Sequence, residues 1–406
     1  MNAAFSPEEL HRAPNALAAH YTSFRVAERL LLTGHSHQAW PDRGFEGHVQ
    51  AWHDAARYVD DKWEHAFAKA ERVRRGFARL LDDQDGTIAL STSTHELVVK
   101  FLSCLPLRER PRIVTTDGEF HSLRRQLDRL AEEGLEVVKV PSVPADDVAD
   151  RLIAELDDRT AAVMASCVLF GNAHVVPGLG AVLERCRHVG AELLVDAYHA
   201  LNVVPWSIRR ERLQDAFVVG GGYKYCQLGE GNSFLRVPGD RRLRPVITGW
   251  FSEFEVLASV RRGGEVPYGE GPARFAGATY DATSHYRAAS VFDFFEEHAL
   301  TPELLRQVSQ HQVGLLARLF DDLDLDPRLV TRDRSVELER IGGFLALRTP
   351  AASDLRQALH ERGVFTDQRG ETLRLGPAPY LSDPQLTDAM LIVGEVVRRR
   401  SGAGTE

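Results

Sequence analysis

Between residues 66 and 240 the sequence switches repeatedly between two hydrophobic periods, and this alternation limits the folds that the chain can adopt. Runs that are apolar throughout occur at residues 87–90, 112–116, 135–140, 161–166, 191–196 and 215–220. Most of them are separated by stretches with helical spacing, at residues 94–105, 119–133, 145–156 and 178–189. Continuous apolar runs are typical of strands buried on both faces, and strands that alternate with helices form mainly parallel sheets. We therefore predict an α/β fold with a mainly parallel, mixed sheet flanked by helices.

The character of the chain changes near residue 282. Residues 283–322 have the spacing of two long amphipathic helices, and short strand-like runs at 344–348 and 372–376 lie between helical stretches. A chain of 406 residues is long enough for a large and a small domain. We predict an N-terminal arm over residues 1–50, a large domain over residues 51–282 and a smaller C-terminal α+β domain over residues 283–406.

Composition and charge argue against several classes of partner. The formal net charge is −9 and no basic stripe is interleaved with aromatic residues, so nucleic acid is not expected as a partner. No apolar run approaches the roughly 20 residues of a membrane span, and the first ten residues lack the pattern of a signal peptide. The four cysteines form no C-x-x-C pair. Free thiols fit a reducing compartment, so we expect a cytoplasmic protein without a membrane partner.

Three residues at the ends of predicted strands share one chemistry. Ligands of open parallel sheets bind outside the carboxyl ends of the strands. Asp196 ends the run 191–196, His199 follows in the next turn, and Lys224 follows the run 215–220 after three glycines. Alone, such an Asp caps a turn and such a Lys lies on the surface. Together, the amine can form an imine with pyridoxal 5′-phosphate (PLP) and the carboxylate can keep the pyridine nitrogen protonated, so the pair indicates a PLP enzyme.

A resemblance to a known family follows from these residues. The segment VDAYHALNVVPWSI, followed by DAFVVGGGYKYCQLGEGNSFLRV, resembles the fold-type-I, class V aminotransferase superfamily and, within it, kynureninase. Piecewise similarity includes LTGHSHQAWP at residues 32–41, GWFSEFE at 249–255 and LRLGPAPYLSD at 373–383. The resemblance implies a PLP enzyme that acts on a small α-amino acid by kynureninase-like cleavage of the Cβ–Cγ bond or of a Cβ substituent. It also implies a homodimer whose two active sites are shared between the chains.

The resemblance implies roles for individual residues. Lys224 would be the Schiff-base lysine, and Asp196 would pair with the pyridine nitrogen. The other cofactor contacts would come from His199, Tyr223, Ser93, Thr94, Phe120, Trp250 and Thr279. Within this set, Ser93 and Thr94 would bind the phosphate at a helix N-terminus, where a dianion is favoured, and Phe120 would stack on the ring. Trp250 and Thr279 would reach the phosphate from the second subunit. Arg374 would hold the substrate carboxylate, Ser36 and His35 would lie near the substrate, and no metal ligand is expected.

Departures from kynureninase leave the substrate open. YVDDKW at residues 58–63 stands where kynureninase has a segment that grips the aromatic ring, and Glu253 stands where it has a histidine. A class V aminotransferase, a β-eliminating lyase or a biosynthetic enzyme acting on an amino-acid conjugate would use the same cofactor residues. Two alternatives differ in class. One is a metal-dependent hydrolase built on the H-x-H pair of His35 and His37, and the other is a catalytically silent relative that only binds ligands.

Overall fold

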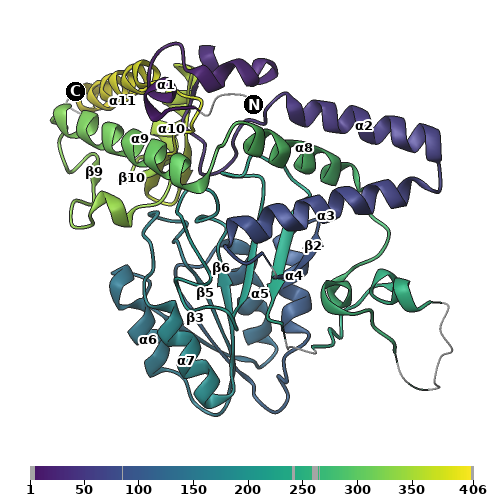
Figure 1. The fold of residues 1–406 in the computed structure, drawn as a ribbon. Helices are drawn as coiled ribbons and strands as arrows, with labels where there is room; N and C mark the ends of the chain where they lie inside the picture. Colours follow the sequence, from purple (N-terminus) through teal and green to yellow (C-terminus); the bar gives the residue numbers. More distant parts are fainter. Residues whose placement is uncertain (1–4, 85, 240–242, 258–263, 265, 404–406) are drawn as a thin grey trace.

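The centre of the molecule is a seven-stranded sheet in the order β2-β8-β7-β6-β5-β3-β4 (Figure 1). The computed structural model describes residues 5–84, 86–239, 243–257, 264 and 266–403. The strands of the central sheet are β2 Thr87–Ser91, β3 Arg112–Thr116, β4 Glu136–Val140, β5 Thr160–Ser166, β6 Glu192–Asp196, β7 Phe217–Gly221 and β8 Ser233–Val237. Neighbouring strands are parallel except at β8, which runs antiparallel to both β2 and β7. The predicted α/β fold with a mainly parallel sheet is confirmed.

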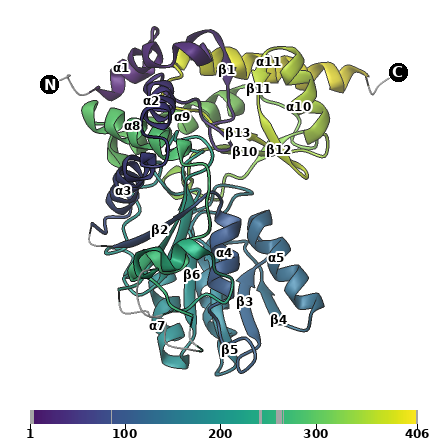
Figure 2. The ribbon, with the colours of Figure 1, turned by 90° about the vertical axis from the view of Figure 1, so that its right-hand side faces the viewer.

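Helices cover both faces of this sheet (Figure 2). The covering helices are α4 Thr94–Leu102, α5 His121–Glu132, α6 Val148–Ala154 and α7 Leu179–Val189. Successive side chains of a strand point to opposite faces, so each strand contributes to two cores. On β7, Phe217 and Val219 belong to the core under α4 and α5, whereas Val218 belongs to the core under α6 and α7. Burial on both faces explains the continuous apolar character of the inner strands β3, β5, β6 and β7.

The described chain after β8 contains helices and short strands, most of them within residues 283–406, the range predicted to form a smaller domain. Its elements are α8 Thr283–Glu297, α9 Pro302–Asp322, β9 Thr331–Arg332, β10 Leu345–Arg348, α10 Ala352–Glu361, β11 Val364–Phe365, β12 Asp367–Arg369, β13 Thr372–Leu375 and α11 Asp383–Ala403, with 3-10 helices at Trp250–Val256, Gly271–Phe275 and Leu338–Arg340. Four of these strands form an antiparallel sheet in the order β12-β13-β10-β9. Helices α9 and α11 pack against each other beside this sheet (Figure 1). The division of the chain at residue 282 stays a prediction.

The N-terminal region packs on the C-terminal elements. It contains α1 Pro7–His11, 3-10 helices at Ala16–His20, Thr22–Phe24 and Val26–Glu28, β1 Leu30–Leu31, α2 Arg43–Tyr58 and α3 Lys62–Leu80. Strand β1 pairs in parallel with β11, and α2 and α3 pack against α8. At Gly47 of α2, a Cβ atom would lie 2.6 Å from the carbonyl oxygen of Tyr286, so only glycine permits this close contact. Helix α2 continues through residue 50, the predicted end of the arm. Within the described residues, no helix is both long and apolar enough to cross a membrane.

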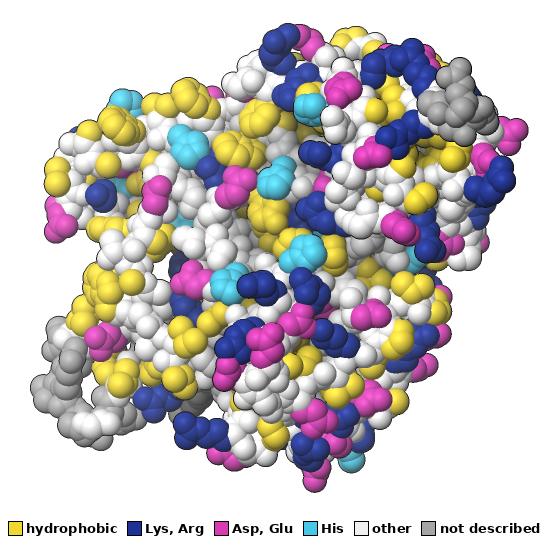
Figure 3. Space-filling model, turned by 180° about the vertical axis from the view of Figure 1, so that it is seen from behind, with side chains coloured by type: hydrophobic (Ala, Val, Ile, Leu, Met, Phe, Trp, Pro, Cys, Tyr) yellow, Lys and Arg dark blue, Asp and Glu magenta, His cyan; other side chains and the backbone are white. Residues whose placement is uncertain are grey.

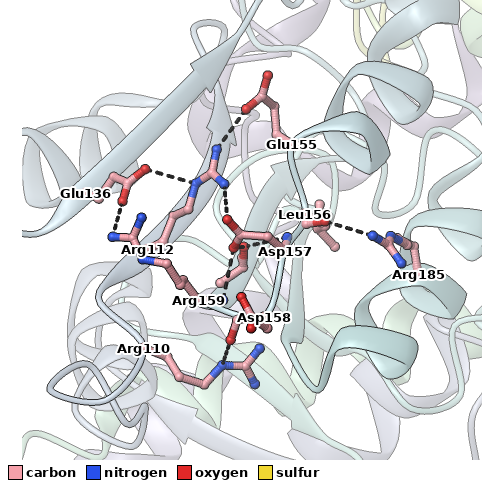
Figure 4. A network of polar contacts seen from close by, with 10 residues as sticks. Arg110, Arg112, Glu136, Glu155, Leu156, Asp157, Asp158, Arg159 and Arg185 are labelled. Atoms are coloured by element: carbon pink, nitrogen blue, oxygen red, sulfur yellow. Dashed lines mark hydrogen bonds and ion pairs between the residues drawn. The ribbon is translucent and has the colours of Figure 1, made fainter.

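Ion pairs tie the amino ends of three central strands together (Figure 4). Arg112, the first residue of β3, contacts three carboxylates: Glu136 at the start of β4 at 3.2 Å, Glu155 at 2.8 Å and Asp157 at 2.6 Å. Glu155 and Asp157 lie in the connection from α6 to β5. Arg159 adds a second pair to Glu136 at 2.6 Å. This network links the amino ends of the parallel strands, at the end of the sheet opposite to their carboxyl ends.

Candidate active site

A cavity of about 250 Å³ lies at the carboxyl edge of the central sheet. Ser166 ends β5 and Asp196 ends β6, and both line the cavity. Ser233 lines it from β8, because the first residue of an antiparallel strand lies at the same edge as the last residues of its parallel neighbours. The face seen in Figure 3 is hollowed near its middle, and histidine and basic side chains lie around the hollow.

Lys224 lies in the cavity wall, shortly after the glycines at the end of β7. Its side chain is buried, and its Nζ atom is 2.8 Å from Nε2 of His199. Burial lowers the pKa of Lys224 to about 7, against the opposing effect of the negative charge of Asp196. At neutral pH a substantial fraction of this amine is therefore uncharged, which is the nucleophilic form.

Aromatic rings surround the amine of Lys224. Its Nζ atom lies 4.6 Å from the ring centre of Tyr198, 5.1 Å from that of Phe120 and 5.7 Å from that of Tyr223. The glycines before the lysine make this packing feasible. A Cβ atom on Gly221 would lie 2.5 Å from the hydroxyl oxygen of Tyr198, so a larger residue would displace that ring. The predicted cofactor residues Phe120 and Tyr223 thus lie with Lys224 in one cavity.

Asp196 and His199 line the same cavity as Lys224. Asp196 Oδ1 accepts a hydrogen bond from the backbone amide of Tyr198 at 2.8 Å. Burial raises the pKa of Asp196, and the nearby Lys224 charge opposes the rise. Burial, followed by the charge of Lys224, lowers the pKa of His199 well below its usual value, so the imidazole is neutral. Among the described residues, Nδ1 of His199 has no hydrogen-bond partner although it is buried.

Ser93 and Thr94 line the cavity at the amino end of α4. Ser93 is the N-cap, and its Oγ accepts a hydrogen bond from the amide of Glu96 at 3.3 Å. The hydroxyl of Thr94 donates to Oγ of Ser233 at 3.3 Å. The first amides of a helix have no carbonyl partner within the helix and carry the positive end of its dipole. This end of the cavity therefore suits a phosphate, and phosphate binding by Ser93 and Thr94 stays a prediction.

Arg374 is buried outside the cavity wall, unlike the residues above. Its Nη1 donates to the carbonyl of Phe170 at 2.7 Å, and its Nη2 pairs with Asp367. Asp367 stands opposite Arg374 in the β12–β13 register. Burial would raise the pKa of Asp367, but the contact with His35 and the charge of Arg374 outweigh it and hold the carboxylate ionised. The predicted substrate-binding arginine thus already has an internal carboxylate partner.

The two other predicted substrate residues also lie outside the cavity wall. His35 is fully buried, with Nε2 3.6 Å from Asp367, and burial lowers its pKa to about 4. Ser36 is half-buried and contacts the ring of His37 at 3.1 Å. His37 is exposed and stacks on Tyr223. The H-x-H pair therefore points in two directions, and the described part of the chain contains no group of three or more His, Cys, Asp or Glu residues placed to hold a metal.

Trp250 and Thr279, predicted to reach the phosphate from a second subunit, lie away from Lys224. Thr279 lines a second, larger cavity of about 670 Å³, which shares Thr92 with the first. Trp250 is 44% exposed and lines neither cavity. The stretch 58–63, where kynureninase has its ring-gripping segment, spans the end of α2, the turn and the start of α3, and it lines neither cavity.

Several residues of the site were not predicted from the sequence, among them Ser166, Glu119 and Asp367. Ser166 stands at the carboxyl end of a predicted strand, so the strand-end rule applies to it. Glu119 directly precedes Phe120 and is buried behind the cavity wall, where its carboxylate bonds to Ser166. Its place next to Phe120, in the loop that follows the strand-like run 112–116, was the available signal. Asp367 lies in a polar stretch, and its contact with Arg374 depends on a hairpin register that the sequence does not display.

The residues present fit PLP. The cavity combines a buried amine, a carboxylate at a neighbouring strand end, an aromatic face and a helix N-terminus. These groups match the aldehyde, pyridine nitrogen, ring and phosphate of the cofactor. The unpartnered Nδ1 of His199 is a further polar atom available to a ligand.

Comparisons with known proteins place this geometry in a structural class. No protein-family model matches the chain. The C-DES mutant with glycine covalently linked to its PLP cofactor superposes with a TM-score of 0.79 at 16% identity, covering 93% of this chain and 98% of that chain. The cysteine desulfurase of Thermococcus onnurineus NA1 gives 0.78 at 16% identity, covering 96% and 99%. The chain has the fold-type-I fold.

One curated protein shares detectable sequence with this fold-type-I chain over most of its length. The chain is 26% identical over 382 residues to isopenicillin N epimerase of Streptomyces clavuligerus, covering 84% of this chain and 87% of that protein. Both comparisons span nearly whole chains. The predicted fold-type-I architecture is thus confirmed, and the chemistry rests on the site residues.

Proposed function

We propose that the protein is a PLP-dependent class V enzyme that acts at the Cα atom of an amino acid or an amino-acid conjugate. The observation that carries the proposal is the buried amine of Lys224, 2.8 Å from His199, in a cavity that Asp196 also lines. Burial disfavours the charge of a lysine that lacks a close carboxylate partner, and so favours its neutral, nucleophilic form. The likeness to a PLP-linked C-DES structure and to an epimerase supports the same class.

Each cavity residue has a task in this chemistry. PLP, when bound, supplies an aldehyde that condenses with an amine and a ring that withdraws electrons from Cα. Asp196 would keep a proton on the ring nitrogen. Lys224, with its amine free, would remove the Cα proton with Nζ and return it. His199, neutral because burial lowers its pKa, orients Nζ through their hydrogen bond.

Proton removal and return at Cα is the reaction that we place first. It requires only the groups gathered around Lys224, and the relative at 26% identity is an epimerase. Kynureninase-like Cβ–Cγ cleavage is the second candidate, supported by the sequence segments around Asp196 and Lys224. Transamination and β-elimination begin with the same proton removal, so they remain outcomes of the same experiment.

Hydrogen exchange at Cα tests the proposal. Purified protein loaded with PLP is incubated in D₂O with single amino acids, including kynurenine, and with peptides bearing a free N-terminal amino-acid unit. Proton NMR and chiral chromatography then follow each compound. Loss of the Cα–H signal with appearance of the opposite enantiomer or epimer supports inversion, and formation of anthranilate and alanine supports kynureninase-like cleavage.

Two variants serve as controls for this experiment. Lys224→Ala should lose exchange at Cα on every compound, because no other amine lines the cavity among the described residues. Lys139→Ala changes a lysine at the protein surface and should leave exchange intact. Exchange that survives in Lys224→Ala at an unchanged rate contradicts the proposed role of this lysine.

A further inference from the structure

Glu119 is a buried carboxyl group that the proposed mechanism does not use. It lies in the loop between β3 and α5, and only 2% of its surface is exposed. Its Oε1 accepts hydrogen bonds from the hydroxyl of Thr116 at 2.7 Å and from the amide of Ser166 at 3.1 Å. Its Oε2 accepts from the hydroxyl of Ser166 at 2.6 Å. These bonds clamp the loop that carries Phe120 to the ends of β3 and β5.

The clamp brings Glu119 close to Asp196. Ser166, which bonds to both oxygens of Glu119, is the register partner of Asp196 across β5 and β6. Burial raises the pKa of Glu119 to about 7, and the negative charge of Asp196 adds to the rise. Asp196 is therefore the member of the pair that ionises first. Two acids so close in a buried site do not carry both charges freely.

The other titratable groups near Glu119 and Asp196 do not account for the interaction between these two carboxyl groups. Cys167, next to Ser166, has a pKa raised well above its usual value by burial and stays neutral. The positive charge of Lys224 lowers the pKa of Asp196, in opposition to burial. From the loop and α5, Asp117 accepts a hydrogen bond from the amide of Ser142, and His121 lies beside Phe170.

We propose that Glu119 is a positioning residue that acts through Asp196: its negative charge strengthens the hold of Asp196 on a protonated ring nitrogen, and its protonation weakens that hold. This inference rests on the proposed function for the identity of the ring. Asp196 lines the cavity and Glu119 does not, so Glu119 contributes charge without touching the ligand. The site would then bind a protonated pyridine ring more tightly as pH rises through neutrality.

Protein without cofactor tests the buried pair first. Glu119→Gln keeps the shape, and its hydrogen bonds can persist because the hydroxyl of Ser166 can turn to accept one. The pKa of Glu119 is higher in the folded chain than in the unfolded chain, so its stabilising contribution is present at low pH and is lost as pH rises through about 7. Between pH 5 and pH 8 the unfolding constant of the wild type should rise, relative to that of Glu119→Gln, on the order of tenfold to a hundredfold. Glu132→Gln, an exposed position on α5, should follow the wild type.

Binding of pyridoxamine 5′-phosphate tests the second step, because this probe carries the ring and phosphate but cannot form an imine with Lys224. Near pH 5.5, Glu119→Gln and the wild type should bind it equally. Near pH 8.5 the wild type should bind about tenfold more tightly, which corresponds to about one pKa unit of interaction. Glu119→Asp retains the charge and should recover part of this difference.

The two measurements separate the possible failures. A ratio of dissociation constants that stays constant from pH 5.5 to pH 8.5 overturns the charge role, since a purely structural defect would not change with pH. Equal pH dependence of unfolding in the wild type and Glu119→Gln overturns the buried pair itself. If neither protein binds the probe while the unfolding curves differ as expected, the pair stands and the assignment of the ring as ligand fails.

Discussion

Burial determines the reactivity of Lys224. Its pKa is lowered to about 7, so its neutral form, which attacks aldehydes, grows as pH rises through 7. We expect labelling of Lys224 by PLP and borohydride to be half-maximal near pH 7, and Lys224→Ala to remove this label. Peptide mapping of protein reduced between pH 5.5 and pH 9 provides the measurement. A label on Lys224 that develops only above pH 9 contradicts the lowered pKa.

The Arg374–Asp367 pair makes a second prediction for single residues. Both side chains are largely buried, and breaking one partner leaves an uncompensated charge. We expect Arg374→Ala to lower the free energy of unfolding by about 3–5 kcal/mol. The double variant Arg374→Ala/Asp367→Ala should recover part of the loss, as measured by urea unfolding. Equal stability of the single and double variants would show that the pair is not coupled.

The same variants test whether Arg374 binds the substrate carboxylate, as the sequence resemblance implies. In that case Asp367 and the substrate carboxylate share the guanidinium group of Arg374. Asp367→Asn should then tighten the binding of carboxylate-bearing substrates, because it removes a competing negative charge. Arg374→Lys should not restore binding lost in Arg374→Ala, since lysine lacks the planar fork. Unchanged apparent affinity in Arg374→Ala would place the carboxylate elsewhere.

At the scale of elements, the Arg112 network joins β3, β4 and the connection to β5 (Figure 4). The Arg112 side chain is only 13% exposed, so its three ion pairs are screened less than surface pairs. We expect Arg112→Met to lower the free energy of unfolding by about 1–3 kcal/mol. Arg124→Met, which removes one exposed pair with Asp128 on α5, should change it by less than about 0.5 kcal/mol. Comparable urea midpoints for the two variants would contradict the network's role.

The elements that could be predicted from the sequence are those with a strong hydrophobic period. The six apolar runs became β2 to β7, and the signal is most continuous in the inner strands β3, β5, β6 and β7, which are largely buried. Strand β8 was not predicted, since it follows a glycine-rich loop and runs antiparallel. Strand β12 was not predicted because Asp367–Arg369 is wholly polar. Lys224, Asp196 and His199 could be found because strand ends converge at one edge. The contacts of Glu119 and Asp367 depend on packing between distant segments, which local patterns do not encode.

At the scale of the whole molecule, an apolar face is left without cover. Phe45, Val49 and Trp52 recur at helical spacing on α2, and Phe45 and Trp52 are 69% and 77% exposed. Val246 and Ile247 are also exposed apolar residues, in the connection after β8. Apolar patches of this kind mark interfaces. They support the homodimer that the sequence resemblance predicts.

The dimer can be tested at this face. We expect the wild type to sediment as a dimer at micromolar concentration and the double variant Phe45→Glu/Trp52→Glu to sediment as a monomer. Leu391→Glu serves as the control, because Leu391 is an exposed apolar residue on α11. A monomeric wild type, or a double variant that stays dimeric, contradicts the prediction. Restored activity on mixing Lys224→Ala with Thr279→Ala would further support active sites shared between chains.

The pairing of β1 with β11 has a consequence for how the chain is made. Leu31 leaves the ribosome about 330 residues before its partner Phe365, which at roughly 5–20 residues per second is a delay of about 15–70 s. All strands of the central sheet are complete by Val237, so that sheet can form during this interval. During this interval β1 lacks its partner strand β11. A nascent chain that stops after Val237 but before β11 would therefore contain a folded central sheet, while its N-terminal segment would not yet be paired with β11.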